Sequence, residues 1–144
     1  MKQCYRYVMI FVGLMLCSCA YAQQAKQTGI REEFDRSVKA YNRMVRWYEL
    51  ENAVMTYADS EQLDESLKQA GILKKRGISI TDFRIISTRY VPVNPEKQTG
   101  DVVAEFDYYI LPSNRVKTIS YHQEWVYREN IKSWKLKNGI PAFE

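Results

Sequence analysis

His122 is the single histidine of the chain, and its neighbours in the predicted sheet decide whether it could transfer protons. If Leu111 faces Val116 across a four-residue turn, Glu105 lies directly opposite His122. A histidine beside carboxylates can act as a general base, because the opposite charge raises its pKa. Charge pairs on the wet face of a sheet are, however, ordinary surface stabilisation. We therefore expect no catalytic residue, and the candidates for proton transfer are His122, Glu105 and Asp107. A lone histidine with scattered carboxylates also predicts no metal site, because a second strong ligand is missing.

A cluster of aromatic side chains is the second candidate for a functional site. Six rings on the predicted first helix and the apolar face of the predicted sheet could line a pocket open at one end: Tyr41, Trp47, Tyr48, Tyr108, Tyr121 and Trp125. Aromatic rings bury large areas, so the same residues also fit a closed core. The inner face of the second to fourth predicted strands has no Asp or Glu, which argues against acid–base chemistry. We expect no cofactor, because the chain has no glycine-rich phosphate loop.

Four segments with alternating apolar residues position these candidates: 78–91, 101–111, 116–128 and 133–137. The first should be kinked near Thr81–Asp82, where the alternation slips. Pairing the second and third strands across residues 112–115 gathers their apolar side chains on one face. Pairing Arg128 with Ser133 places Trp125 opposite Leu136 on that same face. Two independent turns thus predict one common core.

Two helices should precede the strands. Apolar residues recur every three or four positions over residues 30–58, which predicts a long amphipathic helix with a bend or a protruding first turn. A second helix should begin at Asp59 or Ser60 and end before Gly77. The predicted fold class is α+β, with two N-terminal helices packed on one face of a four-stranded antiparallel meander. We expect a single domain over residues 30–144.

This order of elements, ending in "EWVYRENIKSWKLKNGIPAF", resembles the nuclear-transport-factor-two-like (NTF2-like), or cystatin-like, superfamily. Its members often close with a hairpin that carries tryptophan, here Trp125 and Trp134, and a terminal Pro-aromatic segment, here Pro141 and Phe143. The resemblance implies a pocket between helix and sheet, in which some members use an Asp and a Tyr as isomerases or dehydratases. This chain lacks the further helix of the usual plan. The order of elements also resembles small lipoproteins of the outer-membrane assembly machinery, which act as scaffolds.

The N-terminal residues predict an export signal. Two cations, Lys2 and Arg6, precede an uncharged run over residues 7–17 that is too short to span a bilayer. "AYA" before Gln23 fits a signal-peptidase site, which gives a signal peptide of residues 1–22. "LCSC" resembles the bacterial lipoprotein box, which gives a signal of residues 1–18 and lipidation at Cys19. Both alternatives stay open, and residues 23–29 should form a flexible tether.

Composition narrows the class of function. All three cysteines lie within the first 19 residues, so the predicted mature chain has no disulfide framework and no Cys-ligated metal. The full chain has 21 basic and 17 acidic residues, and the signal would remove only two of the basic ones. The small remaining net charge gives no case for nucleic acid as a partner.

Together these observations predict an exported, non-enzymatic accessory or binding protein of the cell envelope, either periplasmic or anchored in a membrane by lipidated Cys19. The alternative is a small enzyme of the isomerase or dehydratase kind, with a pocket between helix and sheet. The outer face of the sheet is also unusually apolar for a wet face. We expect a second copy of the chain or an envelope protein to cover it, through Val103, Tyr109, Leu111, Val116 and Val126.

Overall fold

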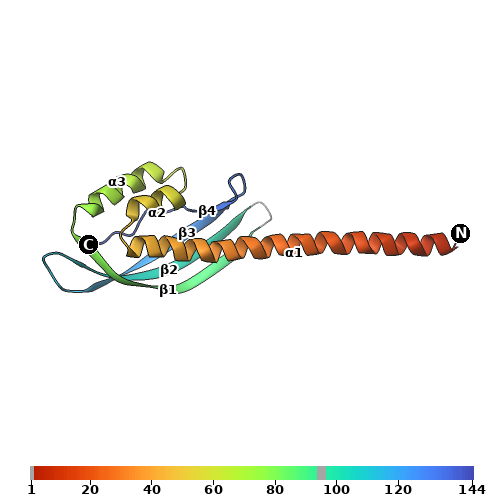
Figure 1. Ribbon diagram of the computed structural model, residues 1–144, viewed down its shortest axis with the longest axis horizontal. Helices are drawn as coiled ribbons and strands as arrows, with labels where there is room; N and C mark the ends of the chain where they lie inside the picture. The colour runs from red at the N-terminus through yellow and green to blue at the C-terminus, as the bar shows by residue number, and fades with distance from the viewer. Residues whose placement is uncertain (1, 94–96) are drawn as a thin grey trace. The chain divides into compact units, whose positions relative to one another are not determined.

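The computed structural model describes residues 2–93 and 97–144, with side chains described from Tyr21 onward. The chain divides into two compact units, Met1–Glu33 and Phe34–Glu144. The first is helical throughout its described part, and the second contains the sheet. The elements in chain order are α1 (Lys2–Arg46), α2 (Leu50–Tyr57), α3 (Leu63–Lys74), β1 (Ile78–Pro92), β2 (Gln98–Ile110), β3 (Lys117–Arg128) and β4 (Ser133–Leu136), as Figure 1 shows. Residues 23–29 lie within α1, and the predicted processing and tether boundaries stay predictions.

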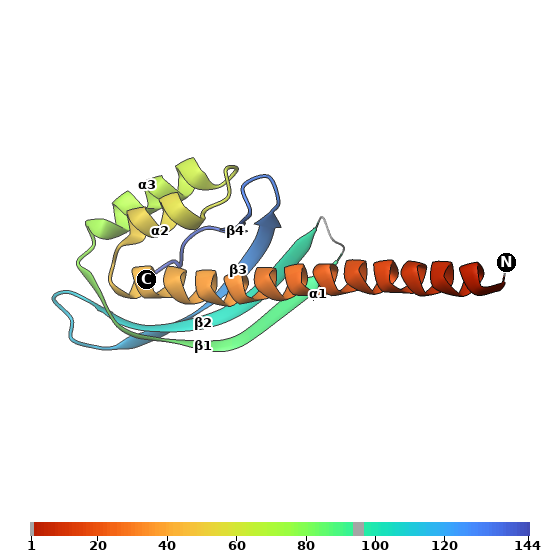
Figure 2. The same ribbon diagram turned by 45° about the vertical axis from the view of Figure 1, so that its right-hand side comes forward.

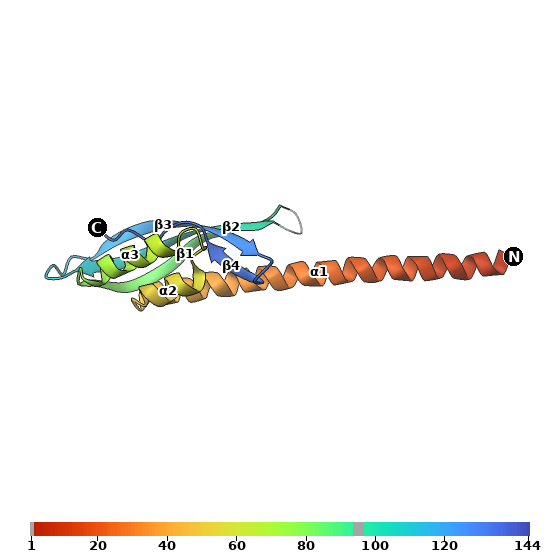
Figure 3. The ribbon, with the colours of Figure 1, turned by 90° about the horizontal axis from the view of Figure 1, so that it is seen from above.

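The predicted α+β class is confirmed, with three helices rather than two before the strands. The four strands follow one another in chain order in one antiparallel sheet (Figure 2). Seen from above in Figure 3, β2 and β3 form a long hairpin and β4 is a short edge strand. The kink expected in β1 is a register shift between Ile80 and Asp82, and a second shift follows between Ile85 and Ser87.

The pairing of β2 with β3 corrects the predicted register by two residues. Phe106 lies opposite Ile119 rather than Tyr121, and His122 lies opposite Val103 rather than Glu105. The connection is longer than the predicted four-residue turn, because residues 111–116 all lie outside the strands. A shift of two residues keeps every side chain on its predicted face, since side chains alternate with a period of two. The next hairpin has the predicted register, including Arg128 opposite Ser133 and Trp125 opposite Leu136.

The helix predicted over residues 30–58 is interrupted. Tyr48 has a φ of 61°, in the left-handed region that is uncommon for a residue other than glycine, and α2 starts just after it. The restart changes which positions face the core. In α2, Met55 is exposed, whereas the adjacent Val54 is buried.

The start of the last helix also differs from the prediction. Asp59 and Ser60 precede α3, which begins at Leu63 and has no side-chain hydrogen bond at its N-cap. The Asp59 carboxylate binds the guanidinium of Arg128 instead. Gly77 follows the helix end with a φ of 64°, a conformation that a glycine adopts without steric cost.

The core of the second unit lies between the helices and one face of the sheet, which we call the inner face. Phe34 contacts the ring of Trp134 at a centroid distance of 4.6 Å, and Tyr57 of α2 meets Trp125 edge-on at 5.8 Å. The opposite face of the sheet, the outer face, carries Glu105, Asp107 and His122. Aromatic side chains fill much of the core, and the largest that are almost wholly buried are Trp125, Trp134, Tyr41, Phe34, Phe106 and Phe143.

Candidate functional site

The carboxylates of the outer face are already engaged by a neighbouring arginine. The Arg84 guanidinium donates from Nε to Glu105 Oε2 and from Nη1 to Asp107 Oδ2, both at 2.8 Å. The Thr118 hydroxyl donates to Asp107 Oδ1 at 2.6 Å. The hydrogen bonds from Thr118 and Arg84 lower the pKa of Asp107, so this carboxylate stays ionised and is a weak base.

His122 lies apart from this group. It faces Val103 across the strands, and its Nε2 is 3.8 Å from Oδ1 of Asp101 on a largely exposed surface. Asp101 in turn accepts two hydrogen bonds from Arg89. The structure therefore does not bring His122, Glu105 and Asp107 into one acid–base group, and the predicted pairing of His122 with Glu105 was wrong for the reason of register given above.

Three of the six predicted pocket residues do meet on the inner face. The hydroxyls of Tyr41 and Tyr121 are 3.2 Å apart, and the Tyr41 ring stands edge-on to Trp125 at 5.6 Å. The Tyr121 hydroxyl also donates to the carbonyl of Gly139 at 2.5 Å. Burial raises the pKa of both tyrosines, which keeps their hydroxyls protonated. With Tyr41 0% and Trp125 1% exposed, these rings pack as core.

A buried amide pair lies beside these rings and was not among the predicted site residues. Gln123 Nε2 donates to Asn42 Oδ1 at 2.7 Å, and Trp125 Nε1 donates to Gln123 Oε1 at 3.1 Å. The Asn42 amide also donates to the carbonyl of Val38 at 2.8 Å. Alternation on β3 could have indicated Gln123, because it lies between two inward-facing aromatic residues. Such a network fixes the orientation of α1 against β3, since an unpaired amide in a core is costly.

The other three predicted pocket residues lie elsewhere. Tyr108 is buried against Phe143 at a ring distance of 5.0 Å, and its hydroxyl donates to the carbonyl of Glu144 at 2.6 Å. Trp47 is 67% exposed in the turn between α1 and α2. Tyr48 is part of the same turn, and its hydroxyl donates to the carbonyl of Leu73. The six residues thus occupy three places rather than one pocket.

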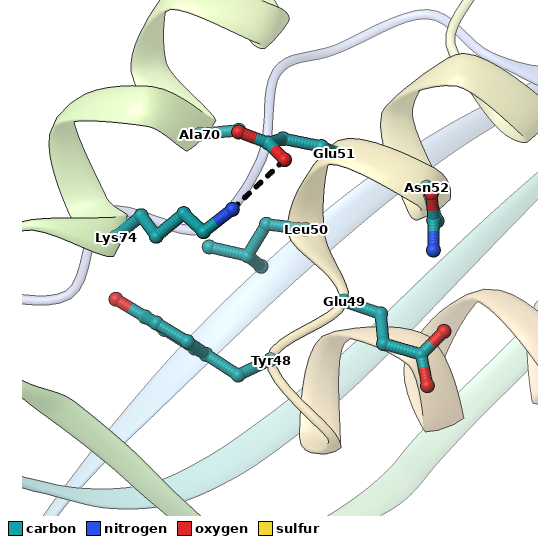
Figure 4. Close-up of a pocket in the computed structure, with 7 residues that line it drawn as sticks. All are labelled: Tyr48, Glu49, Leu50, Glu51, Asn52, Ala70 and Lys74. Carbon is teal, nitrogen blue, oxygen red and sulfur yellow. Dashed lines mark hydrogen bonds and ion pairs between the residues drawn. The ribbon is translucent and has the colours of Figure 1, made fainter.

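Tyr48 does line a cavity, a different one from that predicted. This cavity of about 230 Å³ opens between the α1–α2 turn and α3 (Figure 4). Lys74 reaches across it from α3 and binds Glu51 of α2 at 3.1 Å, on an exposed surface. This pair neutralises itself, and Glu49, which also lines the cavity, leaves the lining with one more acidic than basic side chain. Its lining residues are Tyr48, Glu49, Leu50, Glu51, Asn52, Ala70 and Lys74.

A second cavity, of about 660 Å³, lies where the α2–α3 connection meets the β3–β4 turn. Asp59, which is 4% exposed, and Arg128 line it as an ion pair. The hydrogen bond from Arg128 lowers the pKa of Asp59, so the carboxylate is held as an anion by its own chain. This pair joins α2 to the sheet and is not suited to act as a base.

The described residues contain neither a metal site nor a helix that could span a membrane. No group of three His, Cys, Asp or Glu side chains among them could hold a metal ion. Within the same described part of the chain, no helix has the length and apolar character needed to cross a membrane.

Comparison with known proteins gives only weak structural likeness. No protein-family model matches the chain, and no curated protein matches it. Among solved structures, the intermembrane space region of the chloroplast protein ARC6 is similar to it with a TM-score of 0.39 and 12% identity, over 71% of this chain and 92% of that chain. A TM-score this low carries no argument about shared fold or function. The resemblance to the NTF2-like superfamily and to outer-membrane-assembly lipoproteins therefore stays a prediction.

Proposed function

We propose that this chain is an exported, non-enzymatic accessory or binding protein of the cell envelope, placed in the periplasm or held at a membrane by lipidated Cys19. The observation that supports this most directly is the N-terminal sequence. Lys2 and Arg6 precede the uncharged run over residues 7–17, and two processing sites follow within a few residues. Cys19 lies outside the residues whose side chains the structure describes.

The geometry of the domain favours binding over catalysis. The inner face, where an enzyme of the resembled superfamily would hold its acid–base groups, carries aromatic residues and the amide of Gln123 on the described strands β2 to β4. The outer carboxylates Glu105 and Asp107 are held by Arg84. Among the described residues, neither face of the sheet presents a proton-transfer group beside a buried cavity, which is what a dehydratase or an isomerase would need.

The same proposal includes a partner on the outer face, but the residues available to contact it differ from those predicted. Val103 and Tyr109 are half-buried on this face, and Val126 is buried within its own chain. Leu111 and Val116, predicted on the face, lie instead in the connection between β2 and β3. The surface available to a second copy or an envelope protein is therefore centred on Tyr109 and the Arg84 ion pairs.

The test is cell fractionation of the full chain in a bacterium that processes lipoproteins. Cys19→Ser should move the protein from the membrane fraction to the soluble periplasmic fraction, and mass spectrometry should find a diacylated Cys19 only in the wild type. Cys17→Ser is the matched control, because it changes a cysteine two residues away and should leave the membrane fraction unchanged. An unmodified N-terminus at Gln23 would refute lipidation and leave export intact. An unprocessed protein in the cytoplasm would refute the whole proposal.

A further inference from the structure

Three segments that are distant in the sequence meet at one end of the sheet. The Arg46 guanidinium, in the last turn of α1, donates to the carbonyl of Ile80 near the start of β1. Leu111 N–H, in the β2–β3 connection, donates to the carbonyl of Gly77 at 3.2 Å. Tyr48 binds the C-terminal end of α3 through the carbonyl of Leu73. Figures 1 and 2 show the last turn of α1, the end of α3 and the β2–β3 connection gathered at this end, which we call the turn end.

The turn end exposes large apolar side chains that a folded domain usually covers. Trp47 is 67% exposed, Leu111 60% and Val116 56%. Trp125 and Trp134 are buried, so Trp47 is the one tryptophan of three that meets solvent. The hydrogen bond from the Tyr48 hydroxyl to Leu73 helps to hold the turn in this form despite the unfavourable φ of Tyr48. Backbone strain of this kind costs about 1 kcal/mol or more and persists only where the surroundings enforce it.

Cations surround these apolar side chains. The Arg46 guanidinium lies 5.2 Å from the Trp47 ring centre, a cation–π contact. Lys74 neutralises Glu51, and Glu49 is the remaining carboxylate of the α1–α2 turn. The other cations of the turn end have no carboxylate partner among the described residues. They are Arg43, Arg46, Lys75, Arg76 and Arg115, whereas Lys117 donates to the main-chain oxygen of Glu144 at 2.8 Å.

We propose that the turn end docks on an anionic lipid bilayer, with the Trp47 ring at the headgroup level and the surrounding cations on lipid phosphates. Tryptophan is favoured at this depth because its ring is apolar and its N–H is polar. Each cation near an anionic membrane surface tightens binding by about fivefold. The proposal goes beyond envelope location and does not depend on lipidation at Cys19.

The fluorescence of Trp47 can report docking on a vesicle. The full-length protein is mixed with vesicles of brominated phosphatidylcholine, with or without phosphatidylglycerol, and tryptophan emission is recorded. Anionic vesicles should quench and blue-shift the emission of Trp47, whereas the buried Trp125 and Trp134 should be unaffected. Trp47→Phe should remove the response. Lys75→Gln with Arg115→Gln should weaken binding by about 25-fold, from about fivefold for each cation.

Controls separate this site from attachment through the N-terminus. Cys19→Ser protein should respond as the wild type does, because the quenched ring lies in the folded domain. Ile131→Ser, at an exposed apolar position in the β3–β4 turn, should leave the titration unchanged. Equal quenching with and without phosphatidylglycerol, or vesicle attachment without quenching of Trp47, would overturn the proposal. A shift with polyglutamate and none with anionic vesicles would also overturn it, in favour of an acidic protein partner.

Discussion

Gly100 offers a sharp test of how the core is packed. It lies on β2 opposite Trp125, directly beneath the Phe34 ring. A Cβ added at Gly100 would lie within 2.6 Å of Phe34 Cε2 and 3.0 Å of Cε1, closer than real carbon contacts allow. The ring has little room to move, because it is 0% exposed and packs on Trp134. Gly100→Ala should therefore force a shift in the core.

The size of the effect follows from two opposing terms. Overpacking a core costs about 1–3 kcal/mol, and three blocked ring atoms place this site near the upper value. Replacing glycine by alanine in a strand returns about 0.5–1 kcal/mol by restricting the unfolded chain. The expected net loss in the free energy of unfolding is about 2 kcal/mol. Urea denaturation followed by tryptophan emission measures it, since two of the three tryptophans lie in this core.

Two further variants isolate the contact. Gly71→Ala is the matched control, because Gly71 lies inside α3 with nothing within 4 Å of the added Cβ. It should stabilise the domain by about 0.5–1 kcal/mol. In the Phe34→Leu background the ring atoms are gone, so Gly100→Ala should cost almost nothing. A cost that is the same in both backgrounds would show that Phe34 is not the cause and would refute this account of the packing.

Two other predictions concern buried polar groups. Asp59→Asn should destabilise the domain at neutral pH. Arg128 lowers the pKa of Asp59 from its ordinary 3.8. The difference in unfolding free energy from wild type should therefore be full above about pH 4 and shrink as the pH falls through the lower folded pKa. Urea titrations over this range measure it, and a difference that does not change with pH would contradict the assigned role. Gln123→Leu should cost about 1–3 kcal/mol for each group left unpaired, because Asn42 and the Trp125 N–H lose their partner. Asn42→Leu added to Gln123→Leu should recover part of the loss, and a single variant as stable as wild type would refute the network.

The faces of the sheet could be predicted from the sequence, and the pairing of β2 with β3 could not. Alternation alone decides which side chains point inward, so Trp125 and Tyr121 were placed correctly although the register was wrong by two residues. The register depends on the conformation of residues 111–116, and four-residue and six-residue connections satisfy the same alternation. The β3–β4 pairing was predictable because one short turn joins strands with large apolar partners on both sides.

The six predicted residues do not line one pocket because the backbone conformation at Tyr48 differs from the expected helix. Helical spacing placed Tyr41, Trp47 and Tyr48 on neighbouring turns of one helix, but the positive φ of Tyr48 ends that helix and directs Trp47 to solvent. Nothing at Tyr48 signals this in the sequence, since glycine or asparagine is the usual residue in that conformation. The pairing of Asp59 with Arg128 likewise joins residues 69 positions apart, and only the folded sheet brings them together.

The distribution of charge explains why the turn end stands out from the rest of the surface. On the outer face, Arg84 binds Glu105 and Asp107, and Arg89 binds Asp101, so these ion pairs together carry one more negative than positive charge. Exposed pairs of this kind contribute little to stability, but they leave little net field for a charged partner. At the turn end most cations lack such partners, and they surround the one exposed tryptophan. An anionic surface would therefore be attracted to this end of the sheet rather than to its outer face.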